Sequence, residues 1–205
     1  MYEGGIFETT VGRLIFNAVL PSDHDFVNEQ LGQRELFAII IDLIDEQGTE
    51  IVPKMVDKIK KNGFKFATIS GTTWGIDEVV VPEEKAALVA EGRAQEFEVL
   101  EHYNQGLLSR AERKAQITAI WHKTKDAIEQ KIEEHMEVDG SAYTMWKSGA
   151  RGSIRQISQM TGMKGLILNT RGETIEAPVI SSFKEGLSPM EYFNTTHGSR
   201  KGLAD

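Results

Sequence analysis

The sequence predicts an α+β protein that is mainly helical, with a long antiparallel helical hairpin projecting from a small mixed body and an incomplete helix at its end. Three observations support this prediction. Helix-forming residues dominate residues 82–137, with one break; β-branched and aromatic residues gather around turn signals at 64–81; and a helix that starts near residue 188 meets no stop signal.

Composition sets the broad class. The chain has 205 residues, of which 40% are hydrophobic and 26% charged, an ordinary globular profile. It has no cysteine, which excludes a disulfide framework and a thiolate metal site and agrees with a reducing cytoplasm. No apolar run approaches the ~20 residues of a membrane span, and nothing near the start resembles a targeting segment. We therefore expect a cytoplasmic protein without a membrane partner.

The net charge of -8 is unevenly distributed. Residues 141–205 hold eight basic and five acidic side chains, a balance of +3, so the first 140 residues carry -11. This polarity suits a C-terminal part that faces phosphates and an N-terminal part that faces solvent or protein. Random surface charge is the alternative interpretation.

The N-terminal elements are expected to be short. Residues 2–20 predict short strands and turns, because glycines and Pro21 interrupt their apolar stretches. Residues 28–46 predict a helix ending near Gly48, with one apolar face made by Leu31, Leu36, Ile39, Ile40, Leu43 and Ile44. A second helix is expected over 53–61, where Pro53 gives the start and three lysines before Gly63 give the stop. Residues 64–81 then predict strand and loop.

Residues 82–137 predict the hairpin. Pro82 opens the first arm, the break falls at 104–106, and Ser109 with Glu112 forms a capping box for the second arm. Each arm carries an apolar seam, so the arms should pair as an antiparallel coiled coil about 40 Å long. The expected seam residues are Ala90, Ala94 and Phe97 on the first arm, and Ile117, Ile120, Trp121, Ile128 and Ile132 on the second.

The last helix has a well-specified start and no end. Ser188 and Glu191 form a capping box, and Pro189 occupies the first helical position. Two glycines then lie inside the helix, and Asp205 places an acid at the negative end of the helix dipole. The sequence therefore predicts an unfinished helix that can bend or allow another backbone to approach closely.

Arg151 is the first candidate site residue. It lies in a glycine-flanked loop two positions before Ser153, which forms another capping box with Gln156. An arginine at a helix start is well placed for a phosphate, since free amides and the dipole favour an anion and the guanidinium can bind two oxygens. The alternative is a turn that carries a solvated arginine.

A basic stripe on the last helix is the second candidate. His197, Arg200 and Lys201 lie three or four residues apart and so share a helix face that could follow a nucleic-acid backbone, or could be an ordinary polar face. The other histidines, His102, His122 and His135, lack metal-ligand spacing and should be solvated. No catalytic residue and no metal site is identified.

Several motifs resemble one family in matching order. Residues 192–205, with His197-Gly198-Ser199-Arg200-Lys201-Gly202, resemble the first half of the bridge helix in the largest (beta-prime) subunit of bacterial DNA-dependent RNA polymerase. Residues 148–153 resemble that subunit's phosphate-side loop and 160–166 its F-loop region, while 75–77 with 81–83 resemble the entry to its rim helices. The resemblance extends from Tyr2 to Asp205.

The resemblance implies four regions: a funnel-type region at 1–81, the rim-helix hairpin at 82–137, the phosphate-side loop and F-loop region at 138–187, and the truncated bridge helix at 188–205. It implies that Arg151 reaches the triphosphate of the incoming NTP, and that the last helix crosses the main channel. The expected partners are the beta, alpha and omega subunits, the remainder of beta-prime, template DNA, RNA, and secondary-channel factors that bind the hairpin.

The resemblance also implies what this chain does not supply. The aspartate triad that holds catalytic Mg²⁺ would lie before residue 1, so this segment should bind no cofactor and should not be active alone. It would lie in the bacterial cytoplasm, on the nucleoid as part of the polymerase. The alternatives are a freestanding coiled-coil interaction protein, against which the acid-free tip at 104–108 counts, and a split polymerase gene.

Overall fold

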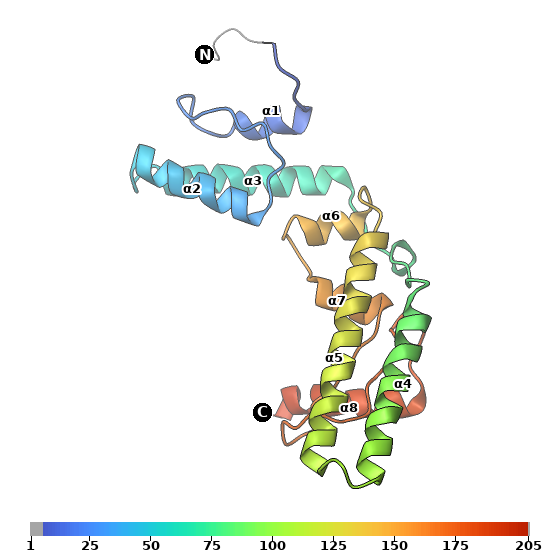
Figure 1. The fold of residues 1–205 in the computed structure, drawn as a ribbon. Coiled ribbons are helices and arrows are strands. Elements are labelled where there is room, and N and C mark those ends of the chain that lie inside the picture. The colour runs from blue at the N-terminus through green and yellow to red at the C-terminus, as the bar shows by residue number, and fades with distance from the viewer. Residues whose placement is uncertain (1–5, 205) are drawn as a thin grey trace. The chain divides into compact units, whose positions relative to one another are not determined.

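The computed structural model describes residues 6–204, which form two compact units (Figure 1). The first unit comprises residues up to 73 together with 147–151, and the second comprises 74–146 together with the residues from 152 onward. The described residues are mainly helical, which confirms the main feature of the predicted class. Their only β-pairing is two isolated antiparallel bridges, Gly165 with Val179 and Leu168 with Thr174.

The first unit begins with a helix where the sequence predicts strands and turns. Helix α1 spans Val11–Asn17, and the hydroxyl of Thr10 accepts a hydrogen bond from the Arg13 amide at 3.4 Å. The buried Asn17 side chain donates to the Val27 carbonyl at 2.9 Å and accepts from the Val27 amide at 2.8 Å. The strand prediction was wrong because this cap and this long-range amide contact are not visible as sequence periodicity. Residues 2–5 of that prediction lie outside the described residues.

Helices α2 and α3 lie side by side in the first unit (Figure 1). Helix α2, Gln33–Gln47, ends at Gly48 as predicted, because Gly48 takes a left-handed φ of 74°. Helix α3, Val52–Ser70, passes through Gly63 and ends at Gly71, whose φ is 63°. The predicted stop at residue 61 and the strand from residue 64 were therefore wrong. An interior glycine costs only about 1 kcal/mol, which seven further helical residues can offset.

The second unit is built on the predicted hairpin. Helix α4, Lys85–Asn104, and helix α5, Arg110–His135, run antiparallel, and their connection contains Gly106 with a φ of 78° (Figure 1). The capping box is present, since the Ser109 hydroxyl accepts from the Glu112 amide at 3.2 Å and the Glu112 carboxylate accepts from the Ser109 amide at 2.8 Å. The hairpin and its cap are confirmed.

The seam between the arms is confirmed on α5 and wrong on α4. The α5 residues Ile117, Trp121, Ile128 and Ile132 are buried and Ile120 is partly buried, but Ala90, Ala94 and Phe97 are exposed. The buried α4 residues are instead Lys85, Val89, Gly92 and Val99. Alanine-rich α4 presents more than one acceptable face, and Thr124 and Trp121 on α5 favour the face that carries Gly92, because a side chain at that position would meet both of them. A Cβ on Gly92 would lie 3.3 Å from Trp121 Cζ3 and 2.8 Å from Thr124 Oγ1.

The hairpin forms the centre of the core of its unit and does not stand free of a body. Helix α7, Ile154–Thr161, packs against α5, and Ile157 and Met163 join the hairpin residues in one buried cluster. The short helix α6, Ser141–Lys147, contributes Ala142 to the same cluster. A 3-10 turn at Ile76–Glu78 precedes α4, and helix α8, Pro189–Ala204, ends the described chain.

Candidate functional site

Arg151 lies in an exposed loop at 148–152. Gly149 and Gly152 have left-handed φ values of 72° and 91°, so the two flanking turns require glycine. A Cβ on Gly149 would meet the Gln33 side chain at 3.1 Å, which shows that this part of the loop lies close to the start of α2. The Arg151 side chain is exposed, and its guanidinium has no ion-pair partner among the described residues. This charge is therefore available to an anion.

The start of α7 differs in detail from the predicted capping box. Ser153 has the extended backbone of an N-cap residue, but its hydroxyl donates to the Gln156 side-chain oxygen at 3.4 Å and accepts from no α7 amide. The capping-box prediction at Ser153 and Gln156 was wrong, because a glutamine side chain offers its own acceptor to the hydroxyl. The first amides of α7 consequently lack a side-chain partner from Ser153.

The start of α8 is held by Glu191. The Ser188 amide donates to the Glu191 carboxylate at 2.9 Å and the Glu191 amide donates to the Ser188 hydroxyl at 3.3 Å, which confirms this capping box. The same carboxylate also accepts from the amides of Ile180 and Ser181, each at 3.0 Å, and from the Ser181 hydroxyl at 2.9 Å. Glu191 therefore joins the first turn of α8 to a segment ten residues upstream.

These contacts change the acidity of Glu191. Partial burial alone would raise its pKa, but the hydrogen bonds from the amides and hydroxyls of Ser181 and Ser188 outweigh burial and lower the pKa to about 2. The carboxylate is thus charged at any physiological pH, and the junction between α8 and residues 180–181 consists of hydrogen bonds from neutral groups to this charged acceptor. The sequence indicated the cap but gave no signal for this second set of partners.

The proposed basic stripe of α8 is only partly described. His197 is partly buried and its ring packs edge-on against Phe193, with centroids 5.2 Å apart and an interplanar angle of 79°. Arg200 is exposed one turn further along. The Lys201 side chain lies outside the described residues. Arg200 is therefore the described member of the stripe that presents its charge to solvent.

Two ion pairs that the sequence did not indicate join the hairpin to residues 163–186. Near the hairpin tip, Arg113 on α5 donates to both carboxylate oxygens of Glu176, at 3.0 and 2.7 Å, while its guanidinium lies 4.5 Å from the centre of the Tyr103 ring on α4. Burial raises the pKa of the nearby Glu96 carboxyl, and the charge of Glu176 adds to this rise. The Arg113–Glu176 ion pair thus joins the hairpin tip to the segment that contains Val179, which forms the β-bridge with Gly165.

At the base of the hairpin, the buried Lys85 pairs with Glu185. Although burial would raise the pKa of Glu185, hydrogen bonds from Lys85 and Ser182 lower it. The Lys184 ammonium donates to the Val79 carbonyl at 2.6 Å beside this pair. The pairs at Arg113 and Lys85 span 63 and 100 residues in sequence, so no local pattern could have revealed them.

The weaker candidates have structural explanations. Trp121 is 1% exposed and packs in the hairpin seam, as predicted. His102 and His122 are exposed on the hairpin, and His135 Nδ1 donates to the Lys131 carbonyl oxygen, 2.9 Å away. Within residues 6–204, no three His, Asp or Glu side chains come together as a possible metal site.

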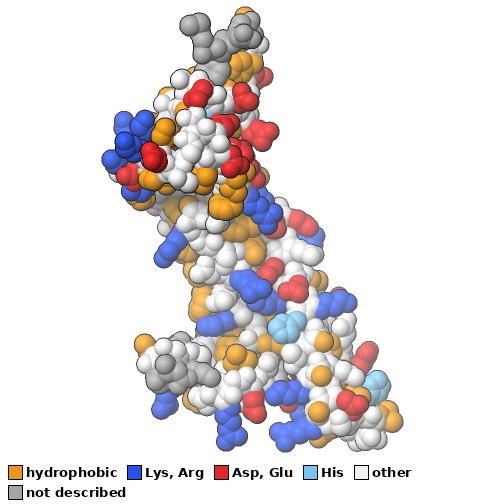
Figure 2. All heavy atoms as spheres, turned by 90° about the vertical axis from the view of Figure 1, so that its left-hand side faces the viewer, with side chains coloured by type: hydrophobic (Ala, Val, Ile, Leu, Met, Phe, Trp, Pro, Cys, Tyr) orange, Lys and Arg blue, Asp and Glu red, His pale blue; other side chains and the backbone are white. Residues whose placement is uncertain are grey.

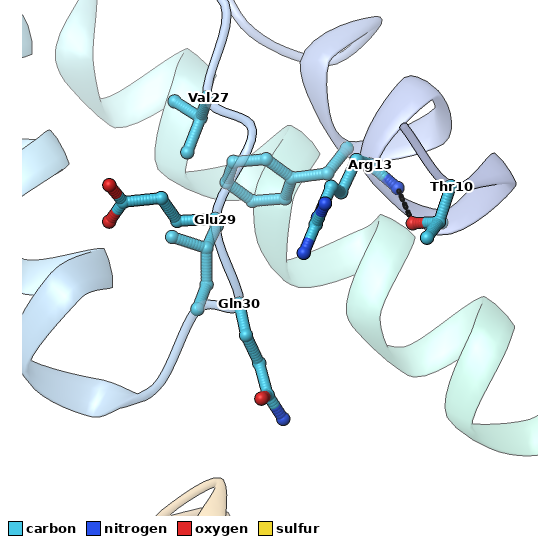
Figure 3. A pocket seen from close by; sticks show the side chains of 8 residues that line it. Thr10, Arg13, Val27, Glu29 and Gln30 are labelled. Atoms are coloured by element: carbon cyan, nitrogen blue, oxygen red, sulfur yellow. Dashed lines mark hydrogen bonds between the residues drawn. The ribbon is translucent and has the colours of Figure 1, made fainter. Parts of the chain in front are cut away.

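A pocket of about 360 Å³ lies beside α1 (Figure 3). Figure 3 shows the side chains that line the pocket, with Arg13 from α1 and Val27, Glu29 and Gln30 from the segment before α2. The Arg13 guanidinium donates to the Asn28 side-chain oxygen at 3.1 Å, and the apolar wall includes partly buried side chains of the core beneath. These contacts support packing of α1, and we assign no chemistry to the pocket.

Comparison with known proteins identifies the class. A family model described as RNA polymerase Rpb1, domain 4, matches residues 98–189. The match runs from α4 through the ion-paired tip, α5, α6, α7 and the bridged segment to the first residue of α8. These elements are therefore similar to a domain of an RNA polymerase subunit.

Whole-chain relatives identify the particular subunit. The DNA-directed RNA polymerase subunit beta' of Rhodococcus jostii is 43% identical over 203 residues, 99% of this chain and 15% of the relative. The same subunit of Heliobacterium modesticaldum is 43% identical over 203 residues, covering 99% of this chain and 17% of the relative. That of Leptospira biflexa is 40% identical over 209 residues, covering 100% and 15%.

The chain therefore belongs to the family of DNA-directed RNA polymerase beta' subunits, which confirms the family resemblance. It spans about 15–17% of the length of these relatives. In the part of the chain that the structure describes, no helix combines the length and the apolar character needed to cross a membrane.

Proposed function

We propose that this chain supports template-directed RNA synthesis as part of the beta' subunit of a DNA-directed RNA polymerase in the cytoplasm, lining the secondary channel and the active centre. The observation that carries the proposal is the similarity of 99% of the chain to beta' subunits at 43% identity. In this setting the reaction is nucleotidyl transfer, in which a 3′ hydroxyl attacks the α-phosphate of an NTP and pyrophosphate leaves. The alternative of a freestanding coiled-coil protein is less favoured, because the relatives carry this segment within much longer chains.

Arg151 is the residue we assign to the NTP. An exposed guanidinium with no ion-pair partner among the described residues can bind two phosphate oxygens at once and neutralise charge that builds up on the leaving pyrophosphate. The glycines at 149 and 152 support this role, since they hold the loop in left-handed turns that leave the side chain clear. Mg²⁺, when bound elsewhere in the complete enzyme, supplies the metal-ion chemistry; this segment contributes positive charge.

Helix α8 is proposed to lie in the main channel beside the nucleic acids. His197, Arg200 and Lys201 are the residues that would face a phosphate backbone there. The Glu191 carboxylate supports this placement, because its hydrogen bonds to Ile180 and Ser181 fix the first turn of α8 on the rest of its unit. A helix anchored at one end can present its later turns to a ligand reproducibly.

The hairpin of α4 and α5 is proposed as the surface for factors that enter the secondary channel. Its outer faces are exposed and charged, and its inner faces are occupied by the core. Other polymerase subunits, namely beta, alpha, omega and the remainder of beta', are the proposed permanent partners, together with template DNA and RNA.

Single-nucleotide addition on a preassembled scaffold tests the assignment of Arg151 in a reassembled polymerase. Losing one charge-assisted contact of ~1.5–3 kcal/mol predicts that Arg151→Ala lowers kcat/KM about ten- to hundredfold and leaves scaffold binding nearly intact. Arg151→Lys should recover part of the loss, because a lysine keeps the positive charge but cannot bind two phosphate oxygens in the bidentate geometry of a guanidinium.

Arg171→Ala provides the matched control, since Arg171 is another exposed arginine next to a left-handed glycine, Gly172. It should leave kcat/KM unchanged. An Arg151→Ala enzyme with normal kcat/KM and weakened scaffold binding would move Arg151 from the NTP to a DNA contact.

A further inference from the structure

The lysines of α3 occupy positions that the helix dipole does not explain. From the sequence alone, Lys58, Lys60 and Lys61 are predicted to lie at a helix C-terminus, where the helix dipole favours cations. The structure continues α3 to Ser70, so these residues lie in the middle of the helix. The dipole acts only within the last turn, so the lysines need another explanation.

Four lysines form a single stripe on α3. Lys54, Lys58, Lys61 and Lys65 recur at intervals of four, three and four residues, which places them within about 60° of one another around the helix axis. All four are exposed, and the buried residues Val52 and Met55 lie on a different face. The stripe is about 17 Å long, with successive charges about one helical turn apart.

The stripe has no acid in ion-pair contact. The only acid of α3, Asp57, pairs with Lys60 at 2.6 Å, and because the nearby charge of Lys61 also lowers the Asp57 pKa, Asp57 offsets part of the charge of the stripe. Among the described residues, no carboxylate forms an ion pair with any of the four lysines. A solvated helix face usually alternates charges of both signs, whereas this face concentrates one sign in a chain whose net charge is -8.

Exposed aromatic rings accompany the stripe. Phe64 is 69% exposed and lies between Lys61 and Lys65 in sequence, and the Lys65 ammonium lies 5.5 Å from the centre of the Phe66 ring. Figure 2 shows Lys and Arg side chains gathered at one edge of the unit that contains α2 and α3, near exposed hydrophobic side chains. Cations that track a backbone, combined with exposed rings for bases, are the features by which proteins bind single strands.

We propose that the lysine stripe of α3 binds the phosphate backbone of a single-stranded nucleic acid, with Phe64 stacking on a base. The proposal rests on the proposed function in one respect, namely that a polymerase handles single-stranded nucleic acid. It concerns a surface in the first unit, on a different element from α8 and from Arg151.

The test is fluorescence anisotropy of a labelled oligouridylate of about 20 nucleotides titrated with the 205-residue chain at several salt concentrations. Four phosphate contacts predict a slope of log K against log salt of about -3. Replacing Lys54, Lys58, Lys61 and Lys65 with glutamine should bring this slope close to zero and weaken binding at low salt at least tenfold.

The matched control removes four cations from the hairpin, Arg93, Arg110, Lys114 and Lys123, also to glutamine. It changes the net charge equally and should alter affinity by less than about threefold if the stripe is the site. Equal losses in the two quadruple variants, with circular dichroism showing both folded, would overturn the proposal in favour of a general charge effect.

Further arms test the ligand class. Phe64→Ala should weaken oligouridylate and oligothymidylate about five- to tenfold and leave duplex DNA unaffected, because only an unpaired base can stack. Polyglutamate that competes as well as the oligouridylate would overturn the proposal in favour of an acidic protein partner. This assay measures oligonucleotide binding and involves no nucleotide addition, so failure of the stripe is distinguishable from failure of the proposed polymerase role.

Discussion

Replacing Gly162 with alanine should loosen the contact between α7 and the hairpin. Gly162 is the residue at which α7 ends, and it lies directly against α5. A Cβ at this position would lie 2.7 Å from Cδ1 of Ile132, 2.9 Å from Cγ2 of Ile128 and 3.0 Å from the Ser158 carbonyl oxygen. All three distances are shorter than ordinary carbon contacts.

The cost follows from what surrounds the new methyl group. Ile128 and Ile132 are 0% and 2% exposed, so neither can rotate into solvent, and the Ser158 carbonyl belongs to the backbone of α7. Overpacking of a well-packed core costs typically ~1–3 kcal/mol. Because three neighbours resist at once, we expect about 2–3 kcal/mol for Gly162→Ala.

Urea unfolding followed by tryptophan fluorescence measures this change in the relevant unit. All three tryptophans, Trp74, Trp121 and Trp146, belong to the second unit, so fluorescence reports its unfolding and not that of the first. The midpoint should fall while the slope of the transition stays the same. Gly198→Ala is the control, because no atom lies within 4 Å of a Cβ there, and it should leave stability unchanged or raise it by up to about 1 kcal/mol.

Ile132→Val supplies a rescue, since it deletes the Cδ1 atom that the new methyl group would meet first. Alone it should cost ~0.5–1.5 kcal/mol. Combined with Gly162→Ala, the total loss should be smaller than the sum of the two single losses by about 0.5 kcal/mol or more. An unchanged midpoint for Gly162→Ala, or strict additivity in the double variant, would refute the close-packing argument.

Glu191→Gln should remove a pH dependence from the second unit. The Glu191 pKa is about 2 in the folded chain and ordinarily 4.5, so the stabilisation that Glu191 gives is present above pH 4.5 and is lost as the pH falls toward 2. Urea unfolding midpoints of the wild type should show a loss of at most about 3 kcal/mol over this range. A pH dependence just as steep in the Glu191→Gln variant would contradict this explanation. Ile128→Ala should cost ~2–5 kcal/mol in thermal unfolding and Ile120→Ala clearly less, because only Ile128 is fully buried; equal effects would place the seam elsewhere. Amides beyond Asn194 should exchange faster with solvent than those of α5, since two glycines weaken α8; protection equal to that of α5 would show stronger packing of α8 than its contacts suggest.

The sequence by itself determined the features that depend on neighbours three or four residues apart. Ser109 with Glu112 and Ser188 with Glu191 form the hydrogen bonds that their spacing predicts, because a capping box needs only the first turn of its own helix. The pairing of α4 with α5 also followed from sequence, since a short connection between two long helices leaves few other arrangements. The choice of Arg151 came from local glycine spacing, and its role in binding NTP stays a prediction.

Only the tertiary structure decided which surfaces and charges meet. The buried face of α4 depends on where Trp121 and Thr124 of α5 can approach, and Gly92 allows this approach although an alanine stripe looks more like a seam in sequence. The pair between Arg113 and Glu176 joins residues 63 positions apart, and the additional partners of Glu191 come from a segment outside its helix. Local hydrogen bonds are fixed by backbone geometry within one turn, whereas packing and ion pairs depend on which distant segment reaches the site, and a single sequence records no such distance.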